Sequence, residues 1–220
     1  MKTLSRILCC VFVITLACGA LFASDLKVAP PPQHAMFVQP FFDINPLTNI
    51  TIFTNLATDP TNLYNAAAGG YYVCGTTCAD VGTDQWIGIP FTNKVADHAT
   101  TLQAAIGYVS GTKRVNLGIY TDNPGVGPGT LLGMGAATNI PTSGMCCSLV
   151  QVKVGGTTGI ALAANTKYWL VATSNDTQAP DFEGVWQASY TSDIAGDVTN
   201  AGWFTFSGLV PAGAVKGTNP

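Results

Sequence analysis

Cysteines are the residues of this chain whose type and spacing point most directly to a chemistry. The sequence has 220 residues and contains seven cysteines. Three of them lie in an N-terminal apolar segment (Cys9, Cys10, Cys18), and the other four are Cys74, Cys78, Cys146 and Cys147. Four thiols in a chain that leaves the reducing cytosol predict two disulfides.

Four cysteines allow three pairings, and the physical arguments leave the choice open. Local pairing of Cys74 with Cys78 requires a bridge between Cys146 and Cys147, whose Cα atoms lie about 3.8 Å apart in a trans peptide. Crossed pairings close a longer loop, worth about 4 kcal/mol against about 2 for a short one. However, neighbouring residues of a strand point to opposite faces and cannot easily reach one partner site. We slightly favour Cys74–Cys78 as a staple within one loop.

Acidic residues near position 180 suggest a calcium site. Asp176, Asp181 and Glu183 crowd one predicted loop, and Asp122 and Asn123 begin another. Calcium binds oxygen ligands from carboxylates and backbone carbonyls. A solvated acidic loop without an ion is the more common use of such residues and stays the alternative. Calcium is the only cofactor that the sequence suggests, with Asp176, Asp181 and Glu183 as its candidate ligands.

Aromatic side chains could form a platform on which sugar rings stack. Trp169 lies in the strongly apolar segment Tyr168–Ala172 and is expected in the core. Trp186 and Tyr190 share one face of a predicted strand, because their spacing of four is even and successive side chains alternate. We therefore take Trp186 and Tyr190 as the candidate ligand-binding pair. Packing of both rings in the core is the more common alternative.

The sequence offers no recognisable catalytic constellation, so we predict no catalytic residue. No serine stands in a Gly-x-Ser-x-Gly frame, and the histidines and acidic residues show no clustered spacing of zinc ligands. His98 follows Asp97 in a segment that we expect to be a solvated turn. Glycosidases typically need two positioned carboxylates, and Glu183 is the sole glutamate. A secreted hydrolase that uses aspartates therefore ranks third among the functions.

Short segments with period-two alternation must position these residues. The clearest is Lys113–Tyr120, with Val115, Leu117 and Ile119 on one face. A run of turn-forming residues follows at Asp122–Gly129. The other predicted strands are Asn49–Leu56, Gln85–Thr92, Thr101–Val109, Leu131–Ala137, Ser148–Val154, Lys167–Thr173, Glu183–Tyr190 and Trp203–Phe206. Eight to ten short strands at regular spacing predict an all-β fold, an antiparallel β-sandwich of jelly-roll type.

The N-terminus has the three-part pattern of a secretory signal peptide. Lys2 and Arg6 precede an apolar stretch, and small residues end at Ala23, where we expect cleavage, with Ala20 as the alternative. A retained transmembrane anchor is the alternative, but the apolar stretch falls slightly short of the roughly 20 residues that span a bilayer. We therefore predict a signal peptide at 1–23, a Pro-rich extended lead-in at 24–48 and a single β-sandwich domain at 49–217.

Charge and composition narrow the classes of partner. The chain has 9 basic and 12 acidic residues, and loss of Lys2 and Arg6 with the signal leaves a net charge of −5. The basic surface that nucleic-acid binding requires is therefore absent from the composition. Only 10% of the residues are charged, well below the usual quarter. This composition is typical of an all-β extracellular protein whose surface is covered by Thr, Asn and Gln.

Several motifs together resemble the secreted bacterial β-sandwich domains known as choice-of-anchor domains. The likeness rests on Val115–Asn123, Pro128–Leu132, Asn165–Val171 and Trp186, and it covers roughly residues 85–190. Pro90–Thr92 and Pro141–Cys147 are similar to a subgroup of exported proteins of unknown function. The resemblance implies a jelly-roll-like fold and an exported location, and it carries no catalytic residues.

These observations together favour a non-enzymatic function outside the cytosol. We predict a secreted, extracellular or cell-surface module with a structural or adhesive role, with no transmembrane helix once the signal is removed. Its expected partners are other surface or matrix components, polysaccharide, or further copies of the same chain. A lectin-like carbohydrate-binding module that uses Trp186 and Tyr190, with calcium as a structural or bridging ion, is the alternative.

Overall fold

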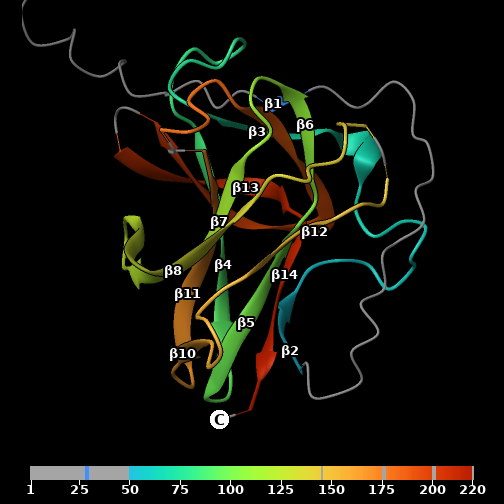
Figure 1. Ribbon diagram of the computed structural model, residues 1–220. Coiled ribbons are helices and arrows are strands. Elements are labelled where there is room, and N and C mark those ends of the chain that lie inside the picture. Colours follow the sequence, from blue (N-terminus) through green and yellow to red (C-terminus); the bar gives the residue numbers. More distant parts are fainter. Residues whose placement is uncertain (1–27, 30–49, 145, 175–176, 200–201, 220) are drawn as a thin grey trace, which may run out of the picture.

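A computed structural model describes residues 28–29, 50–144, 146–174, 177–199 and 202–219 of the chain. These residues form strands almost throughout (Figure 1), and the helical element among them is one short 3-10 turn, η1 (Ala66–Ala68). No helix in the described ranges is both long and apolar enough to span a membrane. The strands are β1 (Val28–Ala29), β2 (Ile50–Thr54), β3 (Gly70–Cys74), β4 (Trp86–Asn93), β5 (Asp97–Ala104), β6 (Ile106–Ser110), β7 (Val115–Asn123), β8 (Gly127–Ala137), β9 (Val150–Lys153), β10 (Ile160–Leu162), β11 (Thr166–Thr173), β12 (Glu183–Thr199), β13 (Gly202–Pro211) and β14 (Gly213–Thr218).

The larger sheet is built around the long strand β12. Its first half pairs with β3 on one side and β6 on the other, and its second half pairs with β4 and β13. The sheet continues from β4 through β11 and β7 to β8 at its edge. All of these pairings are antiparallel, and most neighbours are distant in sequence. Such crossovers are typical of the predicted jelly-roll-like sandwich.

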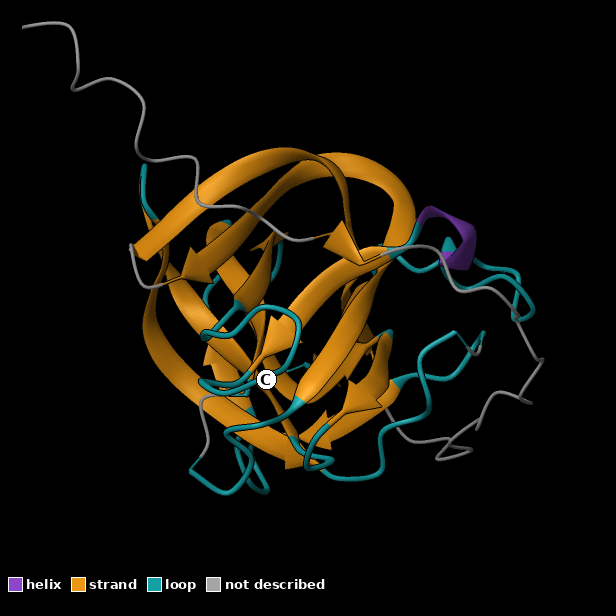
Figure 2. Ribbon diagram, turned by 90° about the horizontal axis from the view of Figure 1, so that it is seen from above, coloured by secondary structure: helices purple, strands orange, loops and turns teal. Residues whose placement is uncertain are grey.

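The smaller sheet lies across from the larger one. β5 pairs with β14, and β14 pairs with β2 at the edge. On its other side β5 pairs with β10 near its start and with β9 near its end. Seen from above, the strands of both sheets curve around one interior (Figure 2). The antiparallel all-β sandwich predicted from the sequence is therefore confirmed.

The core fills the space between the two sheets with aliphatic side chains. The predicted inner face of Lys113–Tyr120 is confirmed, because Val115, Leu117 and Ile119 are fully buried. Leu102 of β5 and Val215 of β14 belong to the same cluster from the smaller sheet.

The chain changes sheets at two points that meet each other. β5 of the smaller sheet runs into β6 of the larger one at Ala105, and β13 runs into β14 at Ala212. The Ala105 N–H donates to the Ala212 carbonyl at 3.0 Å, and the Ala212 N–H donates to the Gln187 carbonyl at 2.8 Å. The Gln187 N–H in turn donates to the Ala105 carbonyl at 2.9 Å. We call this closed trio of residues the corner.

The structure differs from the predicted strands and turns in four respects. Thr101–Val109 was predicted as a single strand, but it divides at Ala105 between β5 and β6. His98, which we expected in a turn, lies within β5. The predicted turn at Asp122–Gly129 is also shorter, because β7 continues to Asn123 and β8 begins at Gly127. β3, β10 and β14 were not predicted.

The N-terminal predictions fall mostly outside the described residues. The signal peptide at 1–23 lies entirely outside them, as does most of the lead-in at 24–48. Within the lead-in, Val28 and Ala29 form β1, which pairs with Tyr71 and Gly70 of β3. The strands of the predicted domain begin with β2 and end with β14.

Candidate functional site

The first disulfide staples the loop that follows β3. Cys74 and Cys78 are bonded across a Cα–Cα distance of 5.6 Å, and both side chains are buried. Cys74 also exchanges two backbone hydrogen bonds with Gln85, of 2.9 and 3.1 Å, which close the base of the loop. The favoured Cys74–Cys78 pairing is therefore confirmed.

A buried carboxylate lies beneath this stapled loop. Glu183 is the partner of Cys74 across β12 and β3, and only 1% of its surface is exposed. Its Oε2 accepts a hydrogen bond of 3.0 Å from the Asp80 N–H. The Tyr72 hydroxyl donates to Asp80 Oδ2 at 3.1 Å. The loop thus covers a polar cluster of Tyr72, Asp80 and Glu183.

Burial is the main cause that raises the pKa of Glu183 above its ordinary value. The Asp80 carboxyl beside it raises this pKa further, because two negative charges at close range repel each other. Burial also raises the pKa of the Tyr72 hydroxyl, and the hydrogen bond to Asp80 adds to the shift. The hydrogen bond from the Asp80 N–H acts in the opposite direction and lowers the pKa of Glu183, but the net shift is upward.

The described residues do not assemble the predicted calcium site in one place. Asp181 Oδ1 accepts a hydrogen bond from the Thr112 N–H at 3.2 Å, whereas Glu183 engages Asp80 on a different loop. Hydrogen bonds from Thr112 lower the pKa of the Asp181 carboxyl. Asp176, the third candidate ligand, lies outside the described residues.

One set of side chains in the described ranges has the spacing of metal ligands: Cys74, Cys78 and Glu183. Both sulfur atoms of this set belong to the first disulfide. A cation needs thiolate ligands at cysteine, and a disulfide has none. The set is therefore a structural contact between the staple and Glu183.

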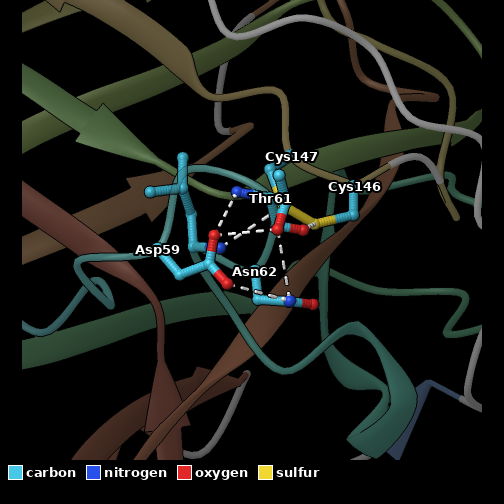
Figure 3. Close-up of a disulfide and its surroundings, with 6 residues drawn as sticks. Asp59, Thr61, Asn62, Cys146 and Cys147 are labelled. Atoms are coloured by element: carbon cyan, nitrogen blue, oxygen red, sulfur yellow. Dashed lines mark hydrogen bonds between the residues drawn. A yellow bond between two sulfur atoms is a disulfide. The ribbon is translucent and has the colours of Figure 1, made fainter.

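The second disulfide joins the neighbours Cys146 and Cys147, and the peptide bond between them is cis. It packs against the turn that follows residue 58 (Figure 3). The Leu63 N–H donates to Cys147 Sγ at 3.3 Å, and Cys146 Sγ lies 3.6 Å from the Thr61 carbonyl oxygen. The pairing left open by the sequence is therefore the local one for all four cysteines.

The turn above this disulfide is held by one aspartate. Asp59 Oδ1 accepts from the Thr61 N–H at 2.9 Å and from the Thr61 hydroxyl at 2.8 Å. Asn62 Nδ2 donates to Asp59 Oδ2 at 3.2 Å, as Figure 3 shows. These bonds lower the pKa of Asp59. Cys146, Cys147, Tyr64, Ala105 and Ala212 form a small apolar cluster below the turn.

The predicted ligand-binding pair is not formed as expected. Trp186 is fully buried, and its Nε1 donates to the Ala212 carbonyl at 2.7 Å. Tyr190, in contrast, has 53% of its surface exposed. The pairing of β12 with β13 shifts register between Ala188 and Ser192, which interrupts the strict alternation assumed from the sequence. Trp186 therefore seals the corner and cannot stack on a ligand.

Three other tryptophans gather on the outward face of the larger sheet. Tyr120, Trp169 and Val171 form a buried cluster there, with Trp86 and Trp203 packed against it. The rings of Trp86 and Trp203 meet edge to face with centroids 6.3 Å apart. The continuous apolar run around Trp169 was the sequence signal for this cluster, because strands covered on both faces lack alternation.

Polar groups fix the position of Trp169. Its Nε1 donates to Asp122 Oδ1 at 2.7 Å, and Lys167 Nζ lies 3.0 Å from the same oxygen. The Lys167 ammonium also lies 5.0 Å from the centroid of the Trp169 ring. Asp122 was suggested as the start of an ion-binding loop. In the structure it accepts a hydrogen bond from the buried Trp169 and forms an ion pair with Lys167.

The edge of the larger sheet carries the largest group of exposed apolar residues. Eight large apolar side chains are exposed in the described parts of the chain, and four of them belong to the hairpin of β7 and β8. These four are Val126, Leu131, Leu132 and Met134. In the described part of the chain, β8 pairs with β7 alone. None of its residues is charged.

A shallow groove of about 190 Å³ separates β2 from the β12–β13 hairpin. It is lined by Phe53, Thr54, Asn55, Ile89, Pro90, Thr191, Asp193, Ile194 and Val210. Asn55 is already engaged, since its Nδ2 donates to the Pro211 carbonyl and its Oδ1 accepts from the Gly213 N–H. The groove therefore offers an apolar floor bordered by Asp193, Thr54 and Thr191. Asp193 Oδ1 also accepts from the Ile194 N–H at 2.8 Å, and Thr54 Oγ1 accepts from the Leu56 N–H at 3.1 Å.

No protein family model matches the chain, and a search of curated proteins found no match.

Proposed function

We propose that this chain is an exported, non-enzymatic β-sandwich with a structural or adhesive role at the cell surface or in the extracellular matrix. The observation that carries this proposal is β8, a long and uncharged edge strand whose apolar side chains face solvent. An edge strand presents unpaired backbone donors and acceptors, which natural monomers usually protect with charges or cover. β8 carries no charged residue, and its residues 129–132 are exposed.

The polar clusters of the described residues also support a structural role. The Glu183 cluster supports a stapled loop, Asp59 supports the turn above the second disulfide, and Asp122 supports Trp169. Each of these three carboxylates accepts hydrogen bonds from neighbours within the chain. Stabilisation by disulfides is the pattern of proteins made for oxidising compartments.

Export is tested by the mature N-terminus. We expect the chain recovered from the medium or the cell surface to have lost residues 1–23, so that its intact mass and N-terminal sequencing place the first residue at Ser24. Recovery of the uncleaved chain from the cytosolic fraction alone would contradict the proposal.

A carbohydrate-binding module is the second candidate function. The groove beside β2 favours it, because Asp193 and Thr191 lie next to the apolar Phe53 and Ile194, and the exposed Tyr190 directly precedes Thr191 in the chain. A glycan array would test it with Tyr190→Ala and Asp193→Ala as the informative variants. Binding lost in both variants supports this function, and no binding by the unaltered protein rules it out.

A further inference from the structure

The stapled loop brings three side chains of the metal-ligand type together. The sulfur atoms of Cys74 and Cys78 and a carboxylate oxygen of Glu183 all lie within 4.8 Å of one another. All three residues are buried, with at most 3% of their surface exposed. The two cysteines have the spacing Cys-x3-Cys, which lies within the range of structural zinc sites. Apart from the bond between the two sulfur atoms, the arrangement is that of a metal site.

Backbone hydrogen bonds hold the loop beside the start of β12 independently of the disulfide. The Gly75 N–H donates to the Phe182 carbonyl at 2.9 Å, and the Thr77 N–H donates to the Pro180 carbonyl at 2.9 Å. The Cys78 N–H donates to the Gly75 carbonyl at 3.3 Å. None of these bonds involves a sulfur atom. The loop therefore keeps both sulfur positions close to Glu183 when the disulfide is reduced.

A buried amide next to these ligands has no hydrogen-bond partner. Gln85 is fully buried, and neither its Oε1 nor its Nε2 has a partner among the described residues. Gln85 is the direct neighbour of Cys74 across an antiparallel bridge, so the two side chains leave the backbone on the same side. A buried polar group without a partner is uncommon and needs an explanation, such as a missing water or ion. Oε1 of Gln85 offers an oxygen ligand beside Cys74.

The carboxylate of Glu183 is already oriented by its neighbours. The Asp80 N–H donates to Glu183 Oε2 at 3.0 Å, and the Tyr72 hydroxyl donates to the Asp80 carboxylate at 3.1 Å. Hydrogen bonds of this kind, made to a ligand rather than to the ion, fix the ligand's orientation in metal sites. Glu183 is therefore held in position before any ion binds.

We infer that Cys74, Cys78 and Glu183 bind a zinc ion when the first disulfide is reduced, with Gln85 Oε1 as the fourth ligand. Four ligands complete the tetrahedron of structural zinc sites. Two of the ligands are sulfur atoms, which select zinc over calcium and magnesium. The loop is then held by the disulfide in the oxidised chain and by the ion in the reduced chain. This inference goes beyond the proposed function and does not depend on it.

The conversion between the two states balances. Reduction of the disulfide adds two electrons and two protons and gives two thiols. A phosphine reductant supplies the electrons and becomes its oxide with an oxygen atom from water. Zinc then displaces both thiol protons to the solvent and forms bonds to the two sulfur atoms and the carboxylate. A disulfide oxidant reverses the change, because it accepts two electrons from the thiolates, becomes a dithiol and leaves the ion without its sulfur ligands.

The test is zinc binding by the full chain, reduced with a phosphine in metal-free buffer and measured by competition with a chromophoric chelator. We expect the unaltered chain to bind an additional zinc ion relative to Cys74→Ser/Cys78→Ser. Cys146→Ser/Cys147→Ser is the matched control, because it removes as many thiols from the second disulfide. It should bind zinc like the unaltered chain, and the oxidised chain should not bind zinc at this site.

Two substitutions test the oxygen ligands. Glu183→Gln should raise the dissociation constant for zinc by roughly tenfold or more, and Gln85→Ala should raise it by a smaller factor. Asp181→Asn is the control, since Asp181 engages Thr112 and not this site. It should leave the zinc affinity unchanged. Circular dichroism verifies that each reduced variant is folded.

Cobalt gives a readout that needs no substitution. Co²⁺ added to the reduced, unaltered chain should show a sulfur-to-cobalt charge-transfer band together with the visible bands of a tetrahedral ion. Zinc should raise the melting temperature of the reduced chain, because it binds the folded state, whereas calcium should leave it unchanged.

Three outcomes would overturn the inference. The first is equal zinc uptake by the reduced unaltered chain and Cys74→Ser/Cys78→Ser, and the second is an unchanged zinc affinity in Glu183→Gln. The third is a cobalt spectrum without the sulfur band. None of these results depends on whether the chain is exported or adheres to a surface, so the proposed function is tested separately.

Discussion

Glu183 couples the protonation of one side chain to the stability of the stapled loop. Its pKa is raised in the folded chain by burial and by the neighbouring Asp80 carboxyl. In the unfolded chain the same group returns to an ordinary glutamate pKa of about 4.3. The folded state therefore binds the proton more tightly than the unfolded state does. The contribution of Glu183 to the free energy of unfolding is therefore largest at acidic pH and is lost as the pH rises through the raised pKa.

We predict that Glu183→Gln weakens this pH dependence. The free energy of unfolding, measured with urea at about pH 4 and about pH 7, should fall less with rising pH in the variant than in the unaltered protein. Asp181→Asn is the control of opposite sign, and its effect is measured between about pH 4 and about pH 2. The pKa of Asp181 is lowered, so its contribution is present at neutral pH and is lost as the pH falls through that pKa. Identical pH profiles for Glu183→Gln and the unaltered protein would show that Glu183 titrates normally.

The first disulfide gives a second prediction for single residues. Replacing both Cys74 and Cys78 by serine removes a short closed loop from the unfolded chain and should lower the free energy of unfolding by about 2 kcal/mol. Urea titration under non-reducing conditions measures this loss. An unchanged unfolding midpoint would mean that the staple does not constrain the unfolded chain.

The sequence favoured the Cys74–Cys78 pairing, which leaves Cys146 and Cys147 to each other, but it could not settle the choice between the local and the crossed pairings. That choice depends on the turn around Asp59, which lies far away in the sequence and packs against both sulfur atoms. Strand alternation could not predict the burial of Trp186 either. The ring is held by Ala212, 26 residues away.

At the scale of elements, the corner of Ala105, Gln187 and Ala212 organises the sandwich. It lets the chain pass between the two sheets while each backbone N–H of the trio keeps a partner. Buried backbone groups without partners would be costly. Trp186 covers this corner and donates its own hydrogen bond to it.

We predict that Trp186→Phe destabilises the sandwich by about 2 kcal/mol, because it loses one buried hydrogen bond and leaves space in the core. Tyr190→Phe on the same strand should change the free energy of unfolding by less than about 0.5 kcal/mol, because Tyr190 is largely exposed. Thermal or urea unfolding compares the two. Equal effects would contradict the placement of Trp186 at the corner.

Strand alternation located the elements whose one face is buried, such as β7, and the resulting count was enough for the fold class. Strand alternation failed for elements whose bounds depend on contacts between residues far apart in the sequence. The break at Ala105 depends on hydrogen bonds to residues about a hundred positions away. β14 was missed because its small residues show little alternation, although it lies between β5 and β2 in the smaller sheet.

At the scale of the whole molecule, the low charge and the exposed edge of the larger sheet both favour association with other molecules. A surface with few charges provides little repulsion between copies, and residues 129–132 of β8 form an exposed, uncharged stretch at the edge of the sheet. The sequence already indicated the low charge and the wealth of strands. The position of β8 at the edge followed only from the order of strands in the sheet.

The most direct test of this account is the native size of the protein in the fraction outside the cell, measured by size-exclusion chromatography with light scattering. We predict a mass that is a multiple of the chain without residues 1–23 and that falls on dilution. A concentration-independent monomer, or a chain present only inside the cell, would contradict an exported module that assembles through its strand edges.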